Sequence, residues 1–264
     1  MTPVTAETAD RSTTSPTAAL TIIGNEILSG RTQDVNAKSL AERLGTLGIR
    51  LREIRVVPDE ADAIVAAVNT LRRRYDHVFT TGGIGPTHDD ITAASIAQAF
   101  GVPLIRHPEA IAILNAHYGD AVTEARLKMA ETPEGAHLID NPVSAAPGFR
   151  MDNVYVLAGV PSIMRAMLES VAAGLDSGAP LVSRAVSAPA REGEVAAPLA
   201  AIQERWPHVD LGSYPWARGG RLGTTLVARS TDTAALDAVI AEVDAMLRDQ
   251  GHEPDIGDHA ATET

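Results

Sequence analysis

The chain has 264 residues, a net charge of −12 and no cysteine. The lack of cysteine excludes disulfides and thiolate metal ligands, which fits a cytoplasmic protein. Because its lysines and arginines are dispersed, we expect no nucleic-acid partner. No apolar run approaches the about 20 residues that span a bilayer, so we expect no membrane partner.

Short strand-like runs alternate with segments of helical periodicity from residue 19 onward, after a Thr-, Ala- and Ser-rich stretch that predicts a disordered leader over residues 1–18. Strands are predicted at 19–24, 49–57, 77–81, 102–106 and 154–159, and helices at 34–47, from Asp59 onward, at 90–100 and at 161–175. Residues 116–146 are assigned to loops near the site. This alternation predicts an α/β fold whose mostly parallel sheet is covered on both faces.

The pattern changes after residue 180. A strand at 181–188, a helix at 192–205, a hairpin over 209–230 and a closing helix predict a small α+β domain of βαββα order over residues 180–250. The closing helix keeps its apolar residues at helical spacing, at Leu236, Val239, Ile240, Val243, Met246 and Leu247. The polar residues 251–264 predict a disordered tail.

The stretch TTGGIGPTHDDIT, residues 80–92, joins a predicted strand to a predicted helix. Gly82, Gly83 and Gly85 can expose successive backbone N–H groups, and the N-terminus of the following helix adds positive potential. The stretch therefore suits an oxyanion such as a phosphate. The alternative is that the glycines only form a tight turn and that Asp89 or Asp90 only caps the helix.

Capping can account for one of the two aspartates only. The other would repel a phosphate unless it were protonated or bridged by a cation, and Mg²⁺ is commonly held by one or two carboxylates plus phosphate oxygens. We therefore expect the aspartates either to bind a divalent metal or to accept hydrogen bonds from a neutral part of the ligand, such as a pterin or a sugar ring.

Two further loops carry polar groups to the same predicted edge of the sheet. Asn25, Glu26 and Ser29 follow the first strand, and Asp59 follows the second. Each loop taken alone is explained by capping, with Asp34 and Asp59 as the caps. Three carboxylate-bearing loops at one edge nevertheless predict a site there.

The histidines show no metal-binding spacing. His88 lies in the glycine stretch and is a candidate ligand contact, whereas His77, His107 and His117 are expected at the surface. Serine-hydrolase, P-loop and zinc-deaminase motifs are absent from the sequence.

Five stretches, taken in order, resemble a known family: IIGNEILSGRTQDVNAKSLAERLGTLGI, VVPDE, TTGGIGPTHDDIT, ETPEGAHLIDNPVSAAPGF and LAGVPSIMRAML. They are similar to the molybdopterin-binding fold of molybdenum-cofactor biosynthesis proteins and of the N-terminal domain of competence/damage-inducible protein A (CinA). The CinA branch is the closer match. The resemblance covers about residues 19–175, and the tail with GSYP resembles the domain that follows in that branch. Ala158 and Ile163 depart from the family's usual proline and acidic residue.

The resemblance implies a three-layer α/β/α sandwich and a set of site residues. Gly82, Gly83, Gly85 and Thr87 would contact the phosphate, Ser144 and Pro147 would line the pocket, and Gly159, Pro161 and Ser162 would close it. Asp59 and Asp90 would match the family's acidic pair and act in catalysis, Glu26 and Asn36 would fall in its first motif, and Glu26, Asp89 and Asp90 would hold a metal.

The resemblance leaves three functions open. The preferred one is binding of molybdopterin, or of a related pterin or nucleotide diphosphate, with Mg²⁺ or another divalent cation. The second is a metal-dependent pyrophosphatase acting on ADP-ribose or FAD, and the third is a non-catalytic regulatory oligomer. Relatives also imply a homo-oligomer, a dimer or trimer. Full-length CinA proteins continue into a nicotinamide-nucleotide amidase domain, whose activity we do not expect here.

Overall fold

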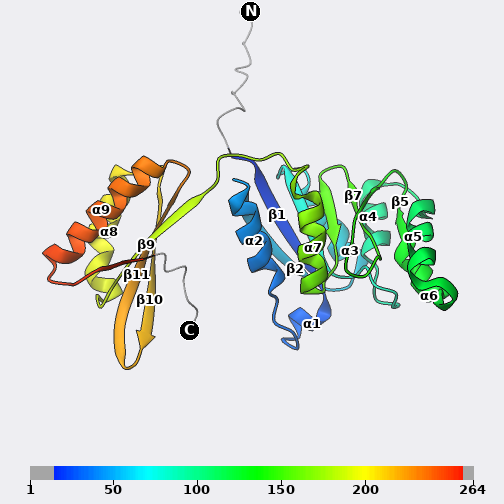
Figure 1. Cartoon of the computed structure of the whole chain (residues 1–264), viewed down its shortest axis with the longest axis horizontal. Coiled ribbons are helices and arrows are strands. Elements are labelled where there is room, and N and C mark those ends of the chain that lie inside the picture. The colour runs from blue at the N-terminus through cyan, green and yellow to red at the C-terminus, as the bar shows by residue number, and fades with distance from the viewer. Residues whose placement is uncertain (1–14, 258–264) are drawn as a thin grey trace, which may run out of the picture. The chain divides into compact units, whose positions relative to one another are not determined.

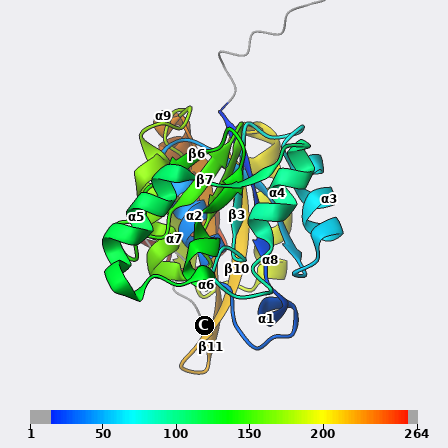
Figure 2. The ribbon, with the colours of Figure 1, turned by 90° about the vertical axis from the view of Figure 1, so that its right-hand side faces the viewer.

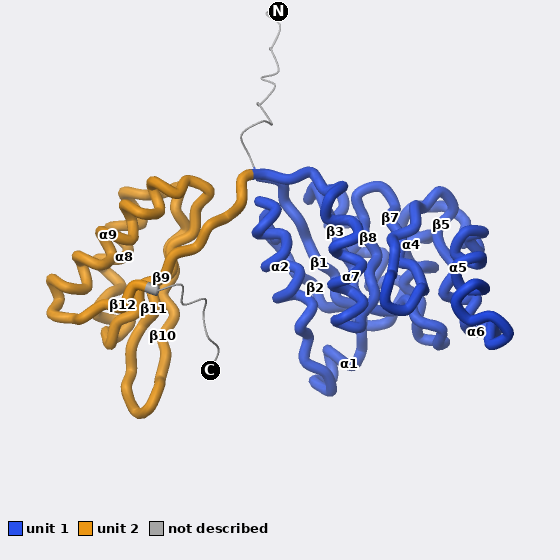
Figure 3. Tube along the Cα trace, in the orientation of Figure 1, with its two compact units in different colours: residues 1–178 blue, residues 179–264 orange. Residues whose placement is uncertain are grey.

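The computed structural model describes residues 15–257. The chain divides into two compact units, Met1–Gly178 and Ala179–Thr264 (Figure 3). Most of the predicted leader, residues 1–14, and half of the predicted tail, residues 258–264, lie outside the described residues. Within the described part, no helix is both long and apolar enough to cross a membrane.

A six-stranded sheet forms the centre of the first unit, in the order β2-β1-β3-β8-β7-β6. These strands span Thr17–Ile23 (β1), Arg50–Val57 (β2), His77–Thr81 (β3), His137–Ile139 (β6), Gly148–Met151 (β7) and Val154–Leu157 (β8). Strands β2, β1, β3 and β8 run parallel, and β7 runs antiparallel to both of its neighbours, β8 and β6. The prediction of a mostly parallel sheet is therefore confirmed.

Helices cover both faces of this sheet (Figures 1 and 2). On one face, α2 (Asn36–Thr46) and α7 (Pro161–Ala172) bury Leu40, Leu44 and Met164 against the sheet. On the other face, α3 (Ala61–Leu71) and α4 (Thr92–Phe100) bury Ile64 and Ile96. The three-layer α/β/α sandwich is confirmed, and it arises because the central strands are apolar on both sides.

The segment assigned to loops, residues 116–146, contains short elements. Helix α5 (Pro108–Tyr118) is followed by η2 (Gly119–Ala121), α6 (Glu124–Leu127), η3 (Lys128–Ala130) and β5 (Glu131–Pro133). Strand β5 pairs antiparallel with β4 (Leu104–Arg106) in a separate two-stranded sheet. The loop assignment is wrong at these elements, because pieces of three or four residues are too short to show a period and are held by tertiary packing.

The second unit is a four-stranded sheet in the order β10-β11-β9-β12. Its elements are β9 (Val182–Ala188), α8 (Glu192–Arg205), β10 (Asp210–Arg218), β11 (Arg221–Ser230), α9 (Thr233–Asp249) and β12 (Asp255–Gly257). Helices α8 and α9 pack together on one face of this sheet. The predicted small α+β domain is confirmed.

Two predicted boundaries are wrong. Strand β1 begins at Thr17, inside the predicted leader, and residues 255–257 of the predicted tail form β12. Strand β12 pairs antiparallel with β9. A three-residue strand has no side-chain period, and its pairing depends on the backbone groups at the open edge of β9, which the sequence does not reveal.

Candidate functional site

The loops that follow β1, β2, β3 and β8 meet at one edge of the first sheet. The backbone N–H of Gly24 donates to the carbonyl of Val57 at 3.2 Å, and that of Gly82 donates to the carbonyl of Leu157 at 3.3 Å. Parallel neighbouring strands end at the same edge, which is where ligands collect in open α/β sheets.

At two positions of the glycine stretch, the backbone conformation and the close packing require glycine. Gly82 has φ 100°, and a Cβ on it would lie 2.2 Å from the carbonyl oxygen of Ile23. Gly83 has φ 66°, and its Cβ would lie 2.3 Å from Oγ1 of Thr92. The Thr92 hydroxyl donates to the Gly82 carbonyl at 2.9 Å, which fixes the turn against the start of α4.

The two aspartates converge on one hydroxyl. Oγ1 of Thr87 lies 2.6 Å from Oδ1 of Asp89 and 2.5 Å from Oδ2 of Asp90. Asp90 also accepts from the backbone N–H of Thr87 at 2.8 Å. Because a hydroxyl carries a single hydrogen, it can donate to only one carboxylate at a time. The Thr87 hydroxyl also lowers the pKa of Asp89, which keeps that carboxylate charged.

Neither aspartate caps α4. The helix begins at Thr92, and no side chain accepts a hydrogen bond at its N-terminus. The capping interpretation of Asp89 and Asp90 is therefore wrong, and both carboxylates belong to the loop itself.

A hydrogen bond joins the first two loops. Oδ2 of Asp59 accepts from the backbone N–H of Asn25 at 2.8 Å, so Asp59 ties the two loops together rather than capping α3, which begins at Ala61. The exposed carboxylate of Glu26 folds back, because a Cβ on Gly24 would lie 2.5 Å from each of its oxygens. Ser29, also in this loop, is exposed.

The start of α2 is connected to the fourth loop. Nδ2 of Asn36, which is buried, donates to the carbonyl of Gly159 at 2.7 Å. Asp34 accepts from the backbone N–H of Ala37 at 2.8 Å, which agrees with its interpretation as a cap. A Cβ on Gly159 would lie 3.2 Å from the Cα of Gly82, so the first, third and fourth loops pack closely.

The residues around NPVSAAPG are organised by Asn141, which is 3% exposed. Its Nδ2 donates to Oγ of Ser144 and to the carbonyl of Ala146, each at 2.7 Å. Its Oδ1 accepts from the backbone N–H groups of Val143 and Ser144 at 3.1 and 3.2 Å. Ser144 therefore supports this loop.

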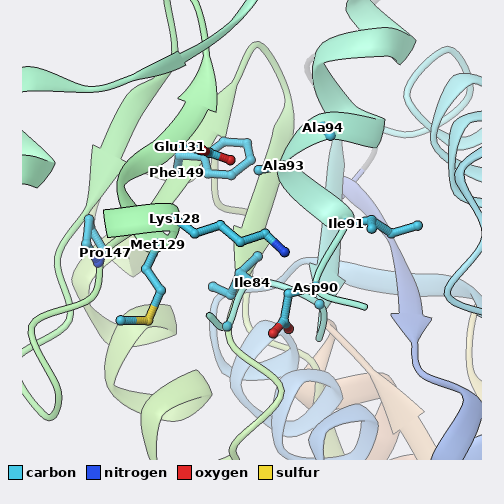
Figure 4. Close-up of a pocket in the computed structure, with 12 residues that line it drawn as sticks. Ile84, Asp90, Ile91, Ala93, Ala94, Lys128, Met129, Glu131, Pro147 and Phe149 are labelled. Carbon is cyan, nitrogen blue, oxygen red and sulfur yellow. The ribbon is translucent and has the colours of Figure 1, made fainter. Parts of the chain in front are cut away.

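A cavity of about 100 Å³ lies between the glycine stretch, η3 and β7 (Figure 4). Its lining consists of Gly83, Ile84, Gly85, Asp90, Ile91, Ala93, Ala94, Lys128, Met129, Glu131, Pro147 and Phe149. Four predicted site residues are among them: Gly83, Gly85, Asp90 and Pro147. The other predicted residues do not line it, namely Glu26, Asn36, Asp59, Gly82, Thr87, Asp89, Ser144, Gly159, Pro161 and Ser162.

Sequence reasoning missed the basic group of this cavity. The ammonium of Lys128, from η3, donates to the backbone carbonyl of Thr87 and extends toward the glycine stretch (Figure 4). Glu131, at the start of β5, is the second missed charge. The nearby start of α4, at Ala93 and Ala94, adds positive potential to that of Lys128. A single lysine in a segment without periodicity gives no signal in the sequence.

The predicted metal ligands are not assembled as one group. Between residues 15 and 257, no three His, Asp or Glu side chains lie close enough together to hold a metal ion. Glu26 sits on the first loop and folds over Gly24, whereas Asp89 and Asp90 converge on Thr87. Two convergent carboxylates still suit Mg²⁺, because this ion is often held by one or two carboxylates together with phosphate oxygens and water.

The histidines contribute little to the site. The side chain of His88 is 98% exposed, with Nδ1 3.9 Å from Oδ1 of Asp89, and it does not line the cavity. His77, expected at the surface, is only 4% exposed, and its Nε2 lies 3.3 Å from the carbonyl oxygen of Asp176. That expectation is wrong because His77 starts the central strand β3.

Comparison with protein families gives two matches. Residues 19–177 match a probable molybdopterin binding domain, and residues 180–255 match the middle domain of FAD synthase. The boundary between the matches lies next to the boundary between the two compact units.

Individual proteins are similar to this chain over different lengths. A protein of Aeropyrum pernix is 43% identical over 161 residues, 58% of this chain and 60% of the relative. A protein of Archaeoglobus fulgidus is 34% identical over 73% of this chain and 83% of its own length. A CinA-like protein of Gloeobacter violaceus is 32% identical over 88% of this chain and 57% of its own length. The chain thus spans about 60% of the length of several relatives.

A solved structure supports the same assignment. The crystal structure of the protein CinA, of unknown function, from Thermoplasma acidophilum is 36% identical, with a TM-score of 0.58 over 61% of this chain and 98% of that chain. The match to the family model covers residues 19–177, more than half of the chain. The structural similarity and this match assign the chain to the same family. The chain belongs to the family of probable molybdopterin-binding domains, as a CinA-like member.

Proposed function

We propose that the chain binds a phosphorylated pterin or nucleotide at the carboxyl edge of the first sheet, with a phosphate in the cavity beside Lys128. The observation that carries this proposal is the meeting of Lys128, the backbone of Gly83 and Gly85 and the start of α4 around one cavity. A cation, the backbone N–H groups of a glycine loop and a helix N-terminus all favour an anion.

The cavity is too small for a whole pterin or nucleotide. A volume of about 100 Å³ admits a phosphate-sized group, whereas ligand pockets typically measure roughly 300–1,000 Å³. The rest of the ligand would lie along the neighbouring loops, where Asp59 and the exposed Glu26 offer acceptors. Carboxylates there would accept hydrogen bonds from the ring N–H groups of a pterin or from ribose hydroxyls.

Lys128 provides the direct test of phosphate binding. Replacing it with methionine removes the charge while keeping much of the side-chain volume, and we expect AMP, ADP-ribose and a phosphorylated pterin to bind about 10- to 100-fold more weakly. Lys38→Met removes the chain's other lysine, on α2 outside the cavity, and is the matched control. Calorimetric titration measures both variants. If Lys128→Met and the unaltered protein bound these ligands with equal affinity, the proposed location of the phosphate in this cavity would be refuted.

A metal-dependent pyrophosphatase is the second candidate, favoured by the convergence of Asp89 and Asp90 on Thr87. Asp89 and Asp90 would hold a divalent cation, which would neutralise charge on a bound diphosphate. Thr87 would orient both carboxylates, and Lys128 would bind a phosphate oxygen. The match of residues 180–255 to a FAD synthase domain is compatible with a nucleotide ligand.

Turnover separates the two candidates. ADP-ribose and FAD are incubated with Mg²⁺, Co²⁺ or no divalent metal, and release of AMP is measured. The pyrophosphatase requires metal-dependent AMP release that falls at least about 100-fold in Asp90→Asn and persists in Asp120→Asn, which alters an exposed carboxylate on η2. If the protein bound these ligands without releasing AMP, only the ligand-binding function would remain. A dimer or trimer, implied by the family, is measured by light scattering on the same samples.

A further inference from the structure

One face of the second sheet is left uncovered by α8 and α9 (Figure 1). Leu211, Leu226 and Ala228 point to the helices and join their core. Side chains alternate between the faces of a strand, so the residues between them point the other way. On the hairpin, this helix-free face carries Asp210, Gly212, Tyr214, Trp216 and Arg218 from β10, and Arg221, Gly223, Thr225, Val227 and Arg229 from β11.

Two aromatic rings on this face lie against glycines. A Cβ on Gly223, directly opposite Trp216, would lie 2.2 Å from Cζ2 and 2.6 Å from Cε2 of the indole. A Cβ on Gly212 would lie 3.0 Å from Cε2 of Tyr214. Each ring therefore covers a glycine and rests one side on the strand backbone. Tyr214 remains 39% exposed.

Guanidinium groups surround the two rings. Cζ of Arg218 lies 5.4 Å from the centroid of the Trp216 ring, and Cζ of Arg229 lies 5.8 Å from that of Tyr214. Nη1 of Arg229 also donates to the Tyr214 hydroxyl at 3.2 Å. Arg221 stands opposite Arg218 in the hairpin register.

The helix-free face of the hairpin is basic, whereas the whole chain has a net charge of −12. The hairpin carries Arg218, Arg221 and Arg229 there, with Asp210 opposite Arg229. Asp255 of β12 lies on the same face of the sheet, because it pairs with Ser187, which pairs with Thr225. Tyr214 is exposed and Trp216 is partly buried, with its indole nitrogen out of contact with solvent. Aromatic rings next to guanidinium groups are the chemistry that stacks planar bases and binds phosphate.

We propose that the helix-free face of the β10–β11 hairpin binds a free nucleotide, with the base stacked on Trp216 or Tyr214 and the phosphate bound by Arg218 and Arg221. A long nucleic-acid strand is disfavoured because the strongly acidic chain repels a polyanion. This site is additional to the cavity of the first unit and uses none of its residues.

Titration with FMN tests the proposal in the full chain, because stacking on an indole quenches flavin fluorescence. Trp216→Ala is expected to weaken FMN binding about 5- to 100-fold, the range found for loss of a stacking aromatic side chain. Trp216→Phe keeps a ring and is expected to retain most of the affinity. The double variant Arg218→Gln with Arg221→Gln is expected to lose the preference for FMN over riboflavin, which lacks the phosphate.

Two controls identify the site. Trp206→Phe alters the chain's other tryptophan, which packs against the helix core, and should bind FMN at this face as the unaltered protein does. Lys128→Met weakens only the cavity of the first unit, so the part of the FMN quenching that Trp216→Ala abolishes should persist in Lys128→Met. AMP should compete with FMN for this face.

Four results would overturn the proposal. The first is no saturable binding of FMN or AMP, and the second is equal affinity for the unaltered protein and Trp216→Ala. The third is an oligothymidylate that binds far more tightly than the mononucleotides, which would assign the face to nucleic acid. The fourth is loss of binding in Lys128→Met alone, which would place the nucleotide in the cavity and leave the proposed function standing without this second site.

Discussion

Replacement of Gly82 by alanine tests how tightly the loops at the sheet edge are packed. Gly82 has φ 100°, and an added Cβ would lie 2.2 Å from the backbone carbonyl oxygen of Ile23. An L-residue in the left-handed region costs about 1–2 kcal/mol, and forcing extra volume into a packed site costs about 1–3 kcal/mol more. The free energy of unfolding of the first unit should therefore fall by about 2–5 kcal/mol.

Gly101→Ala is the matched control for this prediction. Gly101, at the end of α4, has φ 68°, but an added Cβ would meet nothing within 4 Å. Gly101→Ala should therefore lower the free energy of unfolding only by the cost of the left-handed backbone conformation, about 1–2 kcal/mol. Urea unfolding followed by circular dichroism measures both variants, while the fluorescence of Trp206 and Trp216 follows the second unit separately. If Gly82→Ala were no more destabilising than Gly101→Ala, the close approach of Gly82 to Ile23 would be refuted.

Substitutions at three polar residues, each buried or ionised, should also change the stability of the protein. Asn36→Ala should lower the free energy of unfolding by about 1–3 kcal/mol, because it leaves the Gly159 carbonyl without its donor, and faster hydrogen exchange at the start of α7 would accompany it. Asn141→Ala removes four hydrogen bonds and should lower the free energy of unfolding, measured with urea, by at least about 2 kcal/mol. Asn141→Asp should lower it less, because an aspartate oxygen still accepts from the backbone N–H groups of Val143 and Ser144. The hydroxyl and backbone N–H of Thr17 lower the pKa of Asp76, so this carboxylate stabilises the folded state above its unfolded pKa of about 3.9, and the contribution is lost as the pH falls through the lower folded pKa. Asp76→Asn should flatten the fall of the melting temperature on acidification, and an unchanged slope would contradict the role of Thr17.

The sequence by itself determined the elements whose apolar residues form a continuous run or recur at a regular spacing. The strands at β1, β3 and β8 are apolar runs, and α3 and α9 bury residues at helical spacing, so their existence follows from local pattern. The glycine stretch also carried its own signal, because Gly82 and Gly83 take backbone angles that other residues rarely adopt. The α/β order and the edge that carries the candidate site could be predicted for these reasons.

The tertiary structure alone decided which polar groups meet. Lys128 reaches the Thr87 carbonyl across 41 positions of sequence, and Asn36 reaches Gly159 across 123. The same applies to Asp59, predicted as a cap, which instead bonds the neighbouring loop at Asn25. Periodicity reports which face of an element is buried, whereas contacts between loops depend on how the strands are ordered in the sheet. That order is fixed by the packing of the whole unit, and no local stretch of sequence contains it.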